Sequence, residues 1–201
     1  TIYLNALGVA TLDSSYLLQI SSSSCDIANV SISKSVFNCS DIGVNTVTVI
    51  VTDVNGNIDS CKSNISVVDT MKPIPSCQSV SLYLDALGNA TIDSSQINNG
   101  SHDNCLISKI TLSKSSFNCS DLGVDTITMT VTDSYGNWDT CSAVITINDT
   151  LNPVANCLDT TIYLNGFGVF SIDSSYINNL STDNCGISRI QLNRYNFTCA
   201  D

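Results

Sequence analysis

The sequence contains few charged side chains, and glutamate is absent altogether. Charged residues make up 12% of the 201 residues, and only seven of them are Lys or Arg; soluble domains usually carry about 25%. All eighteen acidic residues are Asp, which gives a formal net charge of −11. Nucleic-acid binding needs a cationic surface that displaces counterions, so this composition excludes that class of partner. For the same reason we expect no binding to an anionic membrane surface.

Features that would support membrane insertion or catalysis are also missing. No run of about 18 apolar residues occurs, so we expect no membrane-spanning segment. The chain has one histidine, His102, and no Gly-x-Ser-x-Gly sequence, so it lacks the usual signs of a serine hydrolase. No two cysteines have the Cys-x-x-Cys spacing typical of zinc sites. We therefore expect that the protein is not an enzyme and that it has no cofactor unless it binds calcium.

The cysteines that are present repeat with one period. The chain has ten of them, which indicates an oxidising compartment. The same spacing of eighty positions relates the members of four sets: Cys25, Cys105 and Cys185; Cys39, Cys119 and Cys199; Cys61 and Cys141; Cys77 and Cys157. The surrounding sequence follows the same period, since TIYLNALGVATLDSS at 1 returns as SLYLDALGNATIDSS at 81 and TIYLNGFGVFSIDSS at 161. The chain is therefore a tandem array of one module.

The length of the period predicts where the domains lie. A module of this size suits a small independent domain better than one turn of a solenoid. Pro73 and Pro153 lie in short linkers, where proline limits bending. The sequence thus predicts three domains at 1–70, 71–150 and 151–201, with the first and last truncated. The chain begins inside a strand-like pattern without a Met, so we expect it to be part of a longer protein.

Each repeat shows the alternation that is typical of β-strands. Val47, Val49 and Val51 alternate with Thr residues, and residues 126–132 do the same one repeat later. Asn55-Gly56 between two such runs favours a tight hairpin turn. No window has sustained helical periodicity. Roughly seven short strands in each repeat predict an all-β fold made of β-sandwiches.

The middle repeat carries a recognisable pattern. Cys77 opens it, Asp103-Asn104-Cys105 lies in its middle, and the sequence from Thr132 to Asn137 precedes Cys141 and a final strand. This pattern resembles the hyalin-repeat (HYR) branch of immunoglobulin-like domains. The stretch Phe117–Gly123 resembles the version found in giant Bacteroidetes surface adhesins of the SprB gliding-motility type. The resemblance implies tandem, disulfide-stapled immunoglobulin-like sandwiches in a secreted protein at the cell surface.

The resemblance also implies a disulfide pairing. In the simpler HYR pattern the first cysteine bonds to the cysteine at the start of the last strand, which corresponds here to Cys77–Cys141. This assignment implies in turn the pairs Cys25–Cys39, Cys105–Cys119 and Cys185–Cys199. Cys61 and Cys157 are then expected to lack partners within this chain. The Bacteroidetes resemblance further implies glycosylation at Thr or Ser between Asp and an apolar residue, a pattern that fits Thr70, Thr126 and Thr150.

The aspartates have two competing interpretations. Most lie where turns are expected, and Asp stabilises turns by bonding to the backbone two residues on. Alternatively, Asp69, Asp103 and Asp133 could converge at the first junction and bind calcium, which prefers oxygen ligands. The first repeat has Ser22-Ser23-Ser24-Cys25 where the second has His102-Asp103-Asn104-Cys105, so such a site would not occur in every copy.

Two functions follow from this organisation. The favoured one is a structural stalk or filament segment of a surface adhesin, in which the main partners of a repeat are its neighbours in the chain. The alternative is a repeat that binds glycans or other surface proteins, which should keep exposed aromatic or charged residues at one position in every copy. Tyr3, Tyr83 and Tyr163 persist, but we expect a tyrosine on a strand to serve packing, so the stalk is favoured.

Overall fold

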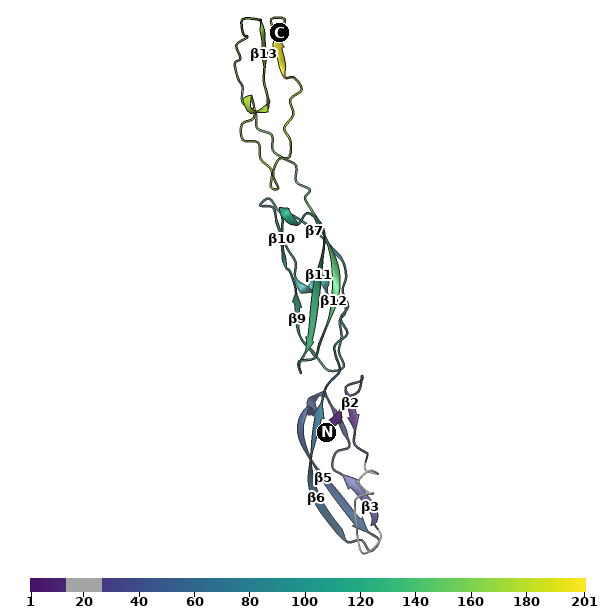
Figure 1. The fold of residues 1–201 in the computed structure, drawn as a ribbon. Helices are drawn as coiled ribbons and strands as arrows, with labels where there is room; N and C mark the ends of the chain where they lie inside the picture. Colours follow the sequence, from purple (N-terminus) through teal and green to yellow (C-terminus); the bar gives the residue numbers. More distant parts are fainter. Residues whose placement is uncertain (14–26) are drawn as a thin grey trace. The chain divides into compact units, whose positions relative to one another are not determined.

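The computed structural model describes residues 1–13 and 27–201 (Figure 1). In the first repeat, a four-stranded sheet has the order β1 (Ile2–Tyr3), β6 (Ile58–Val68), β5 (Gly43–Asp53) and β3 (Ile27–Ile32). A two-stranded sheet pairs β2 (Val9–Thr11) with β4 (Val36–Asn38). β5 and β6 form the expected hairpin around Asn55-Gly56, while β1 runs parallel to β6.

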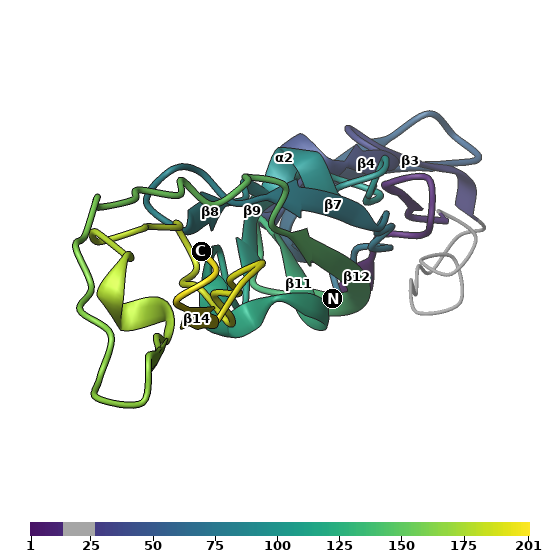
Figure 2. The same ribbon diagram turned by 90° about the horizontal axis from the view of Figure 1, so that it is seen from above.

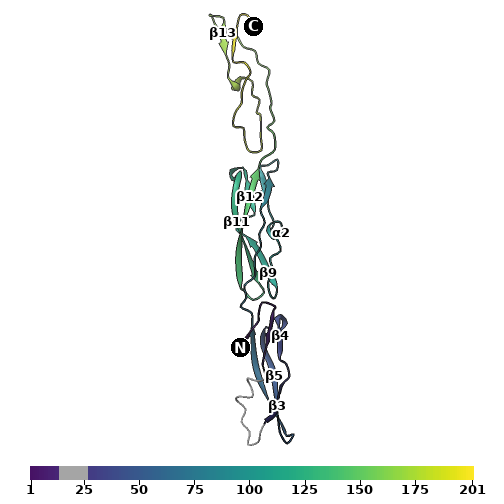
Figure 3. The same ribbon diagram turned by 90° about the vertical axis from the view of Figure 1, so that its right-hand side faces the viewer.

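The second repeat has the same arrangement, and most of its elements lie one period further along the chain. Its four-stranded sheet has the order β7 (Val80–Tyr83), β12 (Trp138–Asn148), β11 (Gly123–Asp133) and β9 (Ile107–Leu112). Figure 2 shows β7, β12 and β11 following one another across this sheet. β8 (Asn89–Thr91) and β10 (Ser116–Asn118) form the two-stranded sheet. Figure 3 shows the position of the short helix α2 (Ser94–Ile97). Its Ile97 side chain is fully buried in the core.

In the third repeat the structure contains the two-stranded sheet of β13 (Val169–Ser171) and β14 (Asn196–Thr198) and the 3-10 turn η3 (Ser174–Tyr176). The cross-strand pair Phe170–Phe197 occupies the positions of Ala10–Phe37 and Ala90–Phe117. In the described parts of the chain, no helix has the length and apolar character needed to span a membrane.

Apolar side chains from the two sheets of a repeat face each other. In the first repeat, Ala10 and Phe37 from the two-stranded sheet pack with Val47 and Val67 from the four-stranded sheet. Phe37 is fully buried. Of the equivalent positions in the second repeat, Phe117, Ile127 and Ile147 are buried and Ala90 is half-buried. Because two sheets enclose one core, each complete repeat is a β-sandwich. The chain is therefore an all-β protein of immunoglobulin-like sandwiches, as the sequence predicts.

The chain divides into two compact units that do not coincide with the sequence repeats. Unit 1 contains Thr1–Gln78, Ser94–Ser113 and Thr128–Ser142, and unit 2 contains Ser79–Asp93, Lys114–Ile127 and Ala143–Asp201. The division passes through the middle repeat. The domain limits predicted at residues 70 and 150 therefore stay predictions drawn from the sequence repeat.

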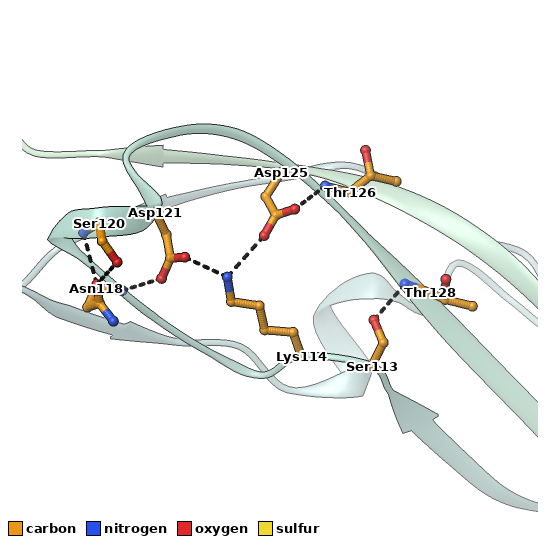
Figure 4. Close-up of polar contacts among 8 residues, drawn as sticks. All are labelled: Ser113, Lys114, Asn118, Ser120, Asp121, Asp125, Thr126 and Thr128. Carbon is orange, nitrogen blue, oxygen red and sulfur yellow. Dashed lines mark hydrogen bonds and ion pairs between the residues drawn. The ribbon is translucent and has the colours of Figure 1, made fainter.

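A lysine anchors the turn between β10 and β11 (Figure 4). The Lys114 ammonium lies 2.6 Å from Asp121 and 3.1 Å from Asp125. It also lies above the ring of Phe117. In the 3-10 turn η2 (Cys119–Asp121), the Asn118 side chain accepts a hydrogen bond from the Ser120 backbone N–H, while Asp121 accepts one from the Asn118 N–H. This capping box satisfies backbone donors at both ends of the turn.

The same anchor occurs in the other repeats. Lys34 pairs with Asp41 above Phe37, and Arg194 pairs with Asp201 above Phe197. In the first two repeats the anchored turn begins with a cysteine, Cys39 in η1 (Cys39–Asp41) or Cys119 in η2. The anchor therefore fixes the position of that cysteine relative to its own sandwich.

The anchor predicts a defined pH dependence of this turn. The hydrogen bond from Lys114 lowers the pKa of Asp121 below its ordinary value of 3.8, and the bond to Asp121 raises the pKa of Lys114 above 10.5. Because the pKa of the Asp121 carboxyl is lowered, its stabilising effect is lost as the pH falls through the pKa that this carboxyl has in the folded state. Because the pKa of the Lys114 ammonium is raised, its stabilising effect is lost as the pH rises through the folded-state pKa of the ammonium. The anchor should therefore persist from about pH 4 to pH 10.

An NMR titration of the Asp121 side-chain carboxyl carbon tests this expectation. Its midpoint should lie below 3.8 and should rise in Lys114→Ala. Lys109→Ala is the control, because Lys109 lies on β9 and forms no ion pair within the described residues. Equal Asp121 midpoints in the wild type and Lys114→Ala would contradict the anchor.

Candidate functional site between the first two repeats

A disulfide bond joins the first repeat to the second. Cys39, at the start of η1, bonds to Cys105, in the loop before β9, and their Cα atoms are 5.5 Å apart. Both cysteines belong to unit 1. Within unit 2, Cys119 bonds to Cys185 in the same way, with a Cα separation of 5.3 Å. The anchored turn of one repeat is thus covalently attached to the middle loop of the next.

These bonds correct three expected pairings. Cys105–Cys119 and Cys185–Cys199 are wrong, and Cys25–Cys39 is excluded because Cys39 bonds to Cys105; Cys25 itself lies outside the described residues. The pairing register of β11 with β9 explains why Cys105 cannot bond to Cys119. Ile107, just after Cys105, pairs with the last residue of this 11-residue strand, whereas Cys119 precedes its first residue. A strand of that length spans roughly 33 Å, far more than the ~7 Å that a disulfide allows between Cα atoms.

The remaining expected pair is confirmed. Cys77 bonds to Cys141 in β12, with the Cα atoms 5.9 Å apart, and this bond closes the second sandwich on itself. Cys61, Cys157 and Cys199 are exposed free thiols. The HYR resemblance implies Cys185 as the partner of Cys199, but Cys185 is bonded to Cys119.

The loop Asp103-Asn104-Cys105 lies directly against a glycine of the first repeat. Gly8 has φ +69°, and a Cβ atom at this position would lie only 2.6 Å from the Asn104 carbonyl oxygen and 2.7 Å from Cys39 Sγ. Glycine is required both by the left-handed backbone and by this close approach. The Asn104 side-chain amide donates to the Asn5 carbonyl oxygen at 3.3 Å and to Asp69 at 3.1 Å.

The β11–β12 hairpin of the second repeat also contacts the first repeat. The Tyr135 hydroxyl donates to the Cys39 carbonyl oxygen at 3.1 Å, and the Asn137 amide donates to the Asp69 carbonyl oxygen at 3.3 Å. Asp133 holds the hairpin by accepting from the backbone N–H groups of Tyr135 and Asn137, both at 2.8 Å. The junction therefore combines a disulfide with polar contacts from two loops.

Asp69, Asp103 and Asp133 meet at this junction, which agrees with the second of the two interpretations of the aspartates. One carboxylate oxygen from each lies within 4.8 Å of the others. Asp69 and Asp133 are buried, with exposed fractions of 5% and 2%, and Asp103 is half-buried. Three carboxylates this close repel one another strongly when they are ionised in a poorly solvated site.

Several oxygens at the junction have no hydrogen-bond donor. The buried Asp69 Oδ2, Asp103 Oδ1 and Asn104 Oδ1 lack partners. In the part of the chain that the structure describes, the ion pairs of Lys34, Lys114 and Arg194 use other aspartates. A buried acceptor without a donor destabilises a fold unless something else satisfies it. These oxygens are therefore available to a cation.

The donor set suits calcium. Calcium binds six to eight oxygens at about 2.3–2.6 Å, so ligands on opposite sides of the ion are about 5 Å apart. The three carboxylates fall within that span, and Asn104, hydrogen-bonded to Asp69, adds an amide oxygen beside them. Zinc is a poor fit, because it prefers His and thiolate ligands and Cys105 is used in a disulfide.

Much of this arrangement recurs at the second junction. The Asn184 amide donates to Asp149 and to the Asp85 carbonyl oxygen, both at 3.1 Å, and Asn184 Oδ1 is again buried without a donor. Asp183 accepts from the Cys185 N–H at 3.0 Å, as Asp103 does from Cys105 at 2.9 Å. The position one period after Asp133 is outside the printed sequence, so the first junction is the site that can be tested.

Two other sets of sequence-predicted residues lie on the surface. Thr70, Thr126 and Thr150 are exposed, so glycosylation of these hydroxyls stays a prediction. The expectation that the repeated tyrosines serve packing is wrong, because Tyr3, Tyr83 and Tyr163 are exposed by 61%, 63% and 81%. On β7, Tyr83 lies between the buried Leu82 and Leu84 and therefore points away from the core.

Comparisons with known proteins give a general likeness. No family model and no curated protein matches the sequence. Human mucin-like protocadherin EC1-2 shares 12% identity over 61% of this chain and 84% of its own, with a TM-score of 0.33. Mouse cadherin-23 EC22-24 shares 16% identity over 80% of this chain and 63% of its own, with a TM-score of 0.33. The fibronectin(III)-like modules of Clostridium thermocellum CbhA share 12% identity over 64% of this chain and 82% of their own, with a TM-score of 0.28. These values are too low to carry an argument about function.

The acidic cluster predicts that calcium stabilises the first junction. Thermal unfolding should shift to higher temperature in calcium than in chelator, since a ligand at 100 times its Kd adds about 2.7 kcal/mol to the unfolding free energy. Asp103→Asn should abolish the shift. In chelator the same variant should be at least as stable as the wild type, because it removes one of three repelling charges.

A matched pair of variants separates calcium binding from turn formation. Asp53 occupies the turn position of Asp133 one repeat earlier and accepts the same hydrogen bonds from Asn55 and Asn57. Both Asp133→Asn and Asp53→Asn weaken a hairpin turn, but Asp53→Asn should keep the calcium response and Asp133→Asn should lose it. Identical wild-type melts in calcium and chelator would remove calcium from the junction.

Proposed function

We propose that this chain is a spacer segment of an extracellular cell-surface adhesin, in which covalent joints between repeats carry tension. The observation that supports this function best is the overlap of the three disulfide loops. They run from Cys39 to Cys105, from Cys77 to Cys141 and from Cys119 to Cys185. Every residue between 39 and 185 therefore lies inside at least one closed loop.

The overlap shortens the path along which force can travel. A chain pulled from its two ends passes from Cys39 directly to Cys105, follows the short segment 105–119, and passes from Cys119 directly to Cys185. The only backbone on this path is the segment 105–119, which is about 50 Å long when it is extended, whereas the backbone from Cys39 to Cys185 without disulfides extends to about 500 Å. Unfolding a sandwich thus cannot lengthen this part of the chain by much.

Other properties of the chain support this role. Disulfides are typical of oxidising compartments such as the cell exterior. The resemblance to HYR domains and to SprB-type gliding adhesins favours a surface protein that transmits force. Calcium at Asp69, Asp103 and Asp133 would add a reversible link to the covalent one. The proposed role requires no catalysis.

Single-molecule stretching through the two chain ends tests the proposal. Under oxidising conditions, the interval from Cys39 to Cys185 should release no more than about 50 Å; after reduction, it should release up to about 500 Å less its folded length. Releases of several hundred ångströms from the oxidised wild type would contradict a locked array.

Two double variants identify which disulfides matter. C77S/C141S leaves the short path intact, so the oxidised extension should stay at about 50 Å. In C39S/C105S the shortest path follows the backbone from Cys39 to Cys77 and again between Cys141 and Cys119, so the interval should release up to about 200 Å less its folded length. Equal extensions for the two variants would show that tension does not follow the bonds between repeats.

The exposed tyrosines favour a second candidate, a repeat that binds surface glycans or proteins. Tyr3, Tyr83 and Tyr163 appear at one position in all three copies and are exposed in all of them. Such repetition is what a multivalent binding surface would show, because each copy adds to the total affinity.

A panel of immobilised glycans distinguishes this candidate from the spacer. The binding function predicts retention of the wild-type chain and loss of retention in the triple variant Y3A/Y83A/Y163A. Unchanged thermal unfolding of the variant would show that its fold is intact. If the wild-type chain is not retained by any glycan, the panel gives the glycan-binding function no support.

A further inference from the structure

The surface that receives the Asp-Asn-Cys loop is present three times in the chain. It consists of a left-handed glycine beside the first cysteine of the anchored turn: Gly8 with Cys39, Gly88 with Cys119, and Gly168 with Cys199. The φ angles of these glycines are +69°, +74° and +71°. The cysteine Sγ lies 3.8, 3.7 and 3.6 Å from the carbonyl oxygen of its glycine. We call this pair of residues the seat.

Two of the three seats are occupied. A Cβ atom on Gly8 would lie 2.6 Å from the Asn104 carbonyl oxygen, and one on Gly88 would lie 2.8 Å from that of Asn184. Both glycines are buried. At Gly168 only Cys199 approaches within 4 Å, and Cys199 is an exposed free thiol. No loop of the described residues therefore occupies the third seat.

The third seat is also built like the occupied ones. The Asn165 side chain accepts from the backbone N–H groups of Phe167 and Val169, just as Asn5 accepts from Leu7 and Val9. In the two occupied seats, the carbonyl oxygens of Asn5 and Asp85 accept a hydrogen bond from the loop asparagine, which is Asn104 or Asn184. Asn165 holds the equivalent position in the third seat. Asp201, paired with Arg194, accepts from the Thr198 N–H at 2.7 Å and holds the turn that carries Cys199.

From this match we propose that Gly168 and Cys199 bind the Asp-Asn-Cys loop of another copy of the repeat and that Cys199 forms a disulfide with its cysteine. Docking would hydrogen-bond the loop asparagine to the Asn165 carbonyl oxygen. Oxidation of the two thiols releases two protons and two electrons, which a disulfide such as oxidised glutathione accepts to become two thiols. The inference rests on the proposed spacer function in one respect. It assumes that successive repeats are generally linked as Cys39 and Cys105 link the first two.

A peptide with the sequence of residues 101–107, Ser-His-Asp-Asn-Cys-Leu-Ile, provides the probe. It is added to the full chain as its mixed disulfide with glutathione, so that attack by a protein thiolate releases glutathione and leaves the peptide attached. Mass spectrometry then compares the attachment at the exposed Cys61, Cys157 and Cys199. Exchange with glutathione disulfide alone corrects for the intrinsic reactivity of each thiol.

The expected result is a preference of at least about fivefold for Cys199 after this correction, since one hydrogen bond of about 1 kcal/mol changes an equilibrium by roughly that factor. A peptide of residues 21–27, which has Ser-Ser-Cys in place of Asp-Asn-Cys, should lose the preference. Equal attachment at all three thiols, or the same preference with both peptides, would overturn the proposal.

Variants of the seat provide a second test. Gly168→Ala adds a Cβ atom 2.5 Å from Cys199 Sγ and should remove the preference, whereas Gly166→Ala, in the same loop with nothing within 4 Å, should keep it. Alkylation of Cys199 by iodoacetamide reports whether the thiol stays accessible in Gly168→Ala. If the preference survives in this variant, the glycine is not part of the seat. None of these results depends on the stretching behaviour of the Cys39–Cys105 joint.

Discussion

The Cys39–Cys105 disulfide holds the Asp-Asn-Cys loop against Gly8, and the other contacts of the first junction depend on that close approach. It brings Asn104 within reach of the Asn5 carbonyl oxygen and of Asp69. It also places Asp103 beside two buried carboxylates. Like charges would otherwise drive these groups apart, so a covalent bond is a suitable means of keeping them together.

The two interpretations of the aspartates turn out not to exclude each other. Asp53 and Asp133 form the same hydrogen-bonded turn, but among residues 1–13 and 27–201 only Asp133 is joined by two further carboxylates. The turn explains why aspartate stands at both positions. The burial of Asp133 and its neighbours, together with their unpaired oxygens, is what distinguishes a candidate ion site from an ordinary turn.

The alternation of apolar residues and the turn residues predicted the strands and the hairpins, and the meeting of Asp69, Asp103 and Asp133 was one of two interpretations that the sequence left open. The sequence period could not decide the cysteine pairing, because a partner within the same repeat and a partner in the neighbouring repeat recur with the same period. That choice depends on strand direction, which carries Cys105 and Cys119 to opposite ends of β11. The exposure of Tyr83 could have been predicted from alternation, since Tyr83 stands between two leucines, Leu82 and Leu84, which are both buried.

The disulfides between repeats also constrain how the chain matures. Cys39 emerges from the ribosome 66 residues before Cys105, so each repeat must keep a reduced thiol until its successor has been made. Meanwhile Cys105 and Cys119, which are much closer together in the sequence, could close a shorter loop at a lower cost in entropy. Pairing of β9 with β11 prevents this by separating the two thiols. Strand assembly therefore favours the observed pairing over the shorter loop, because it holds Cys105 and Cys119 at opposite ends of β11.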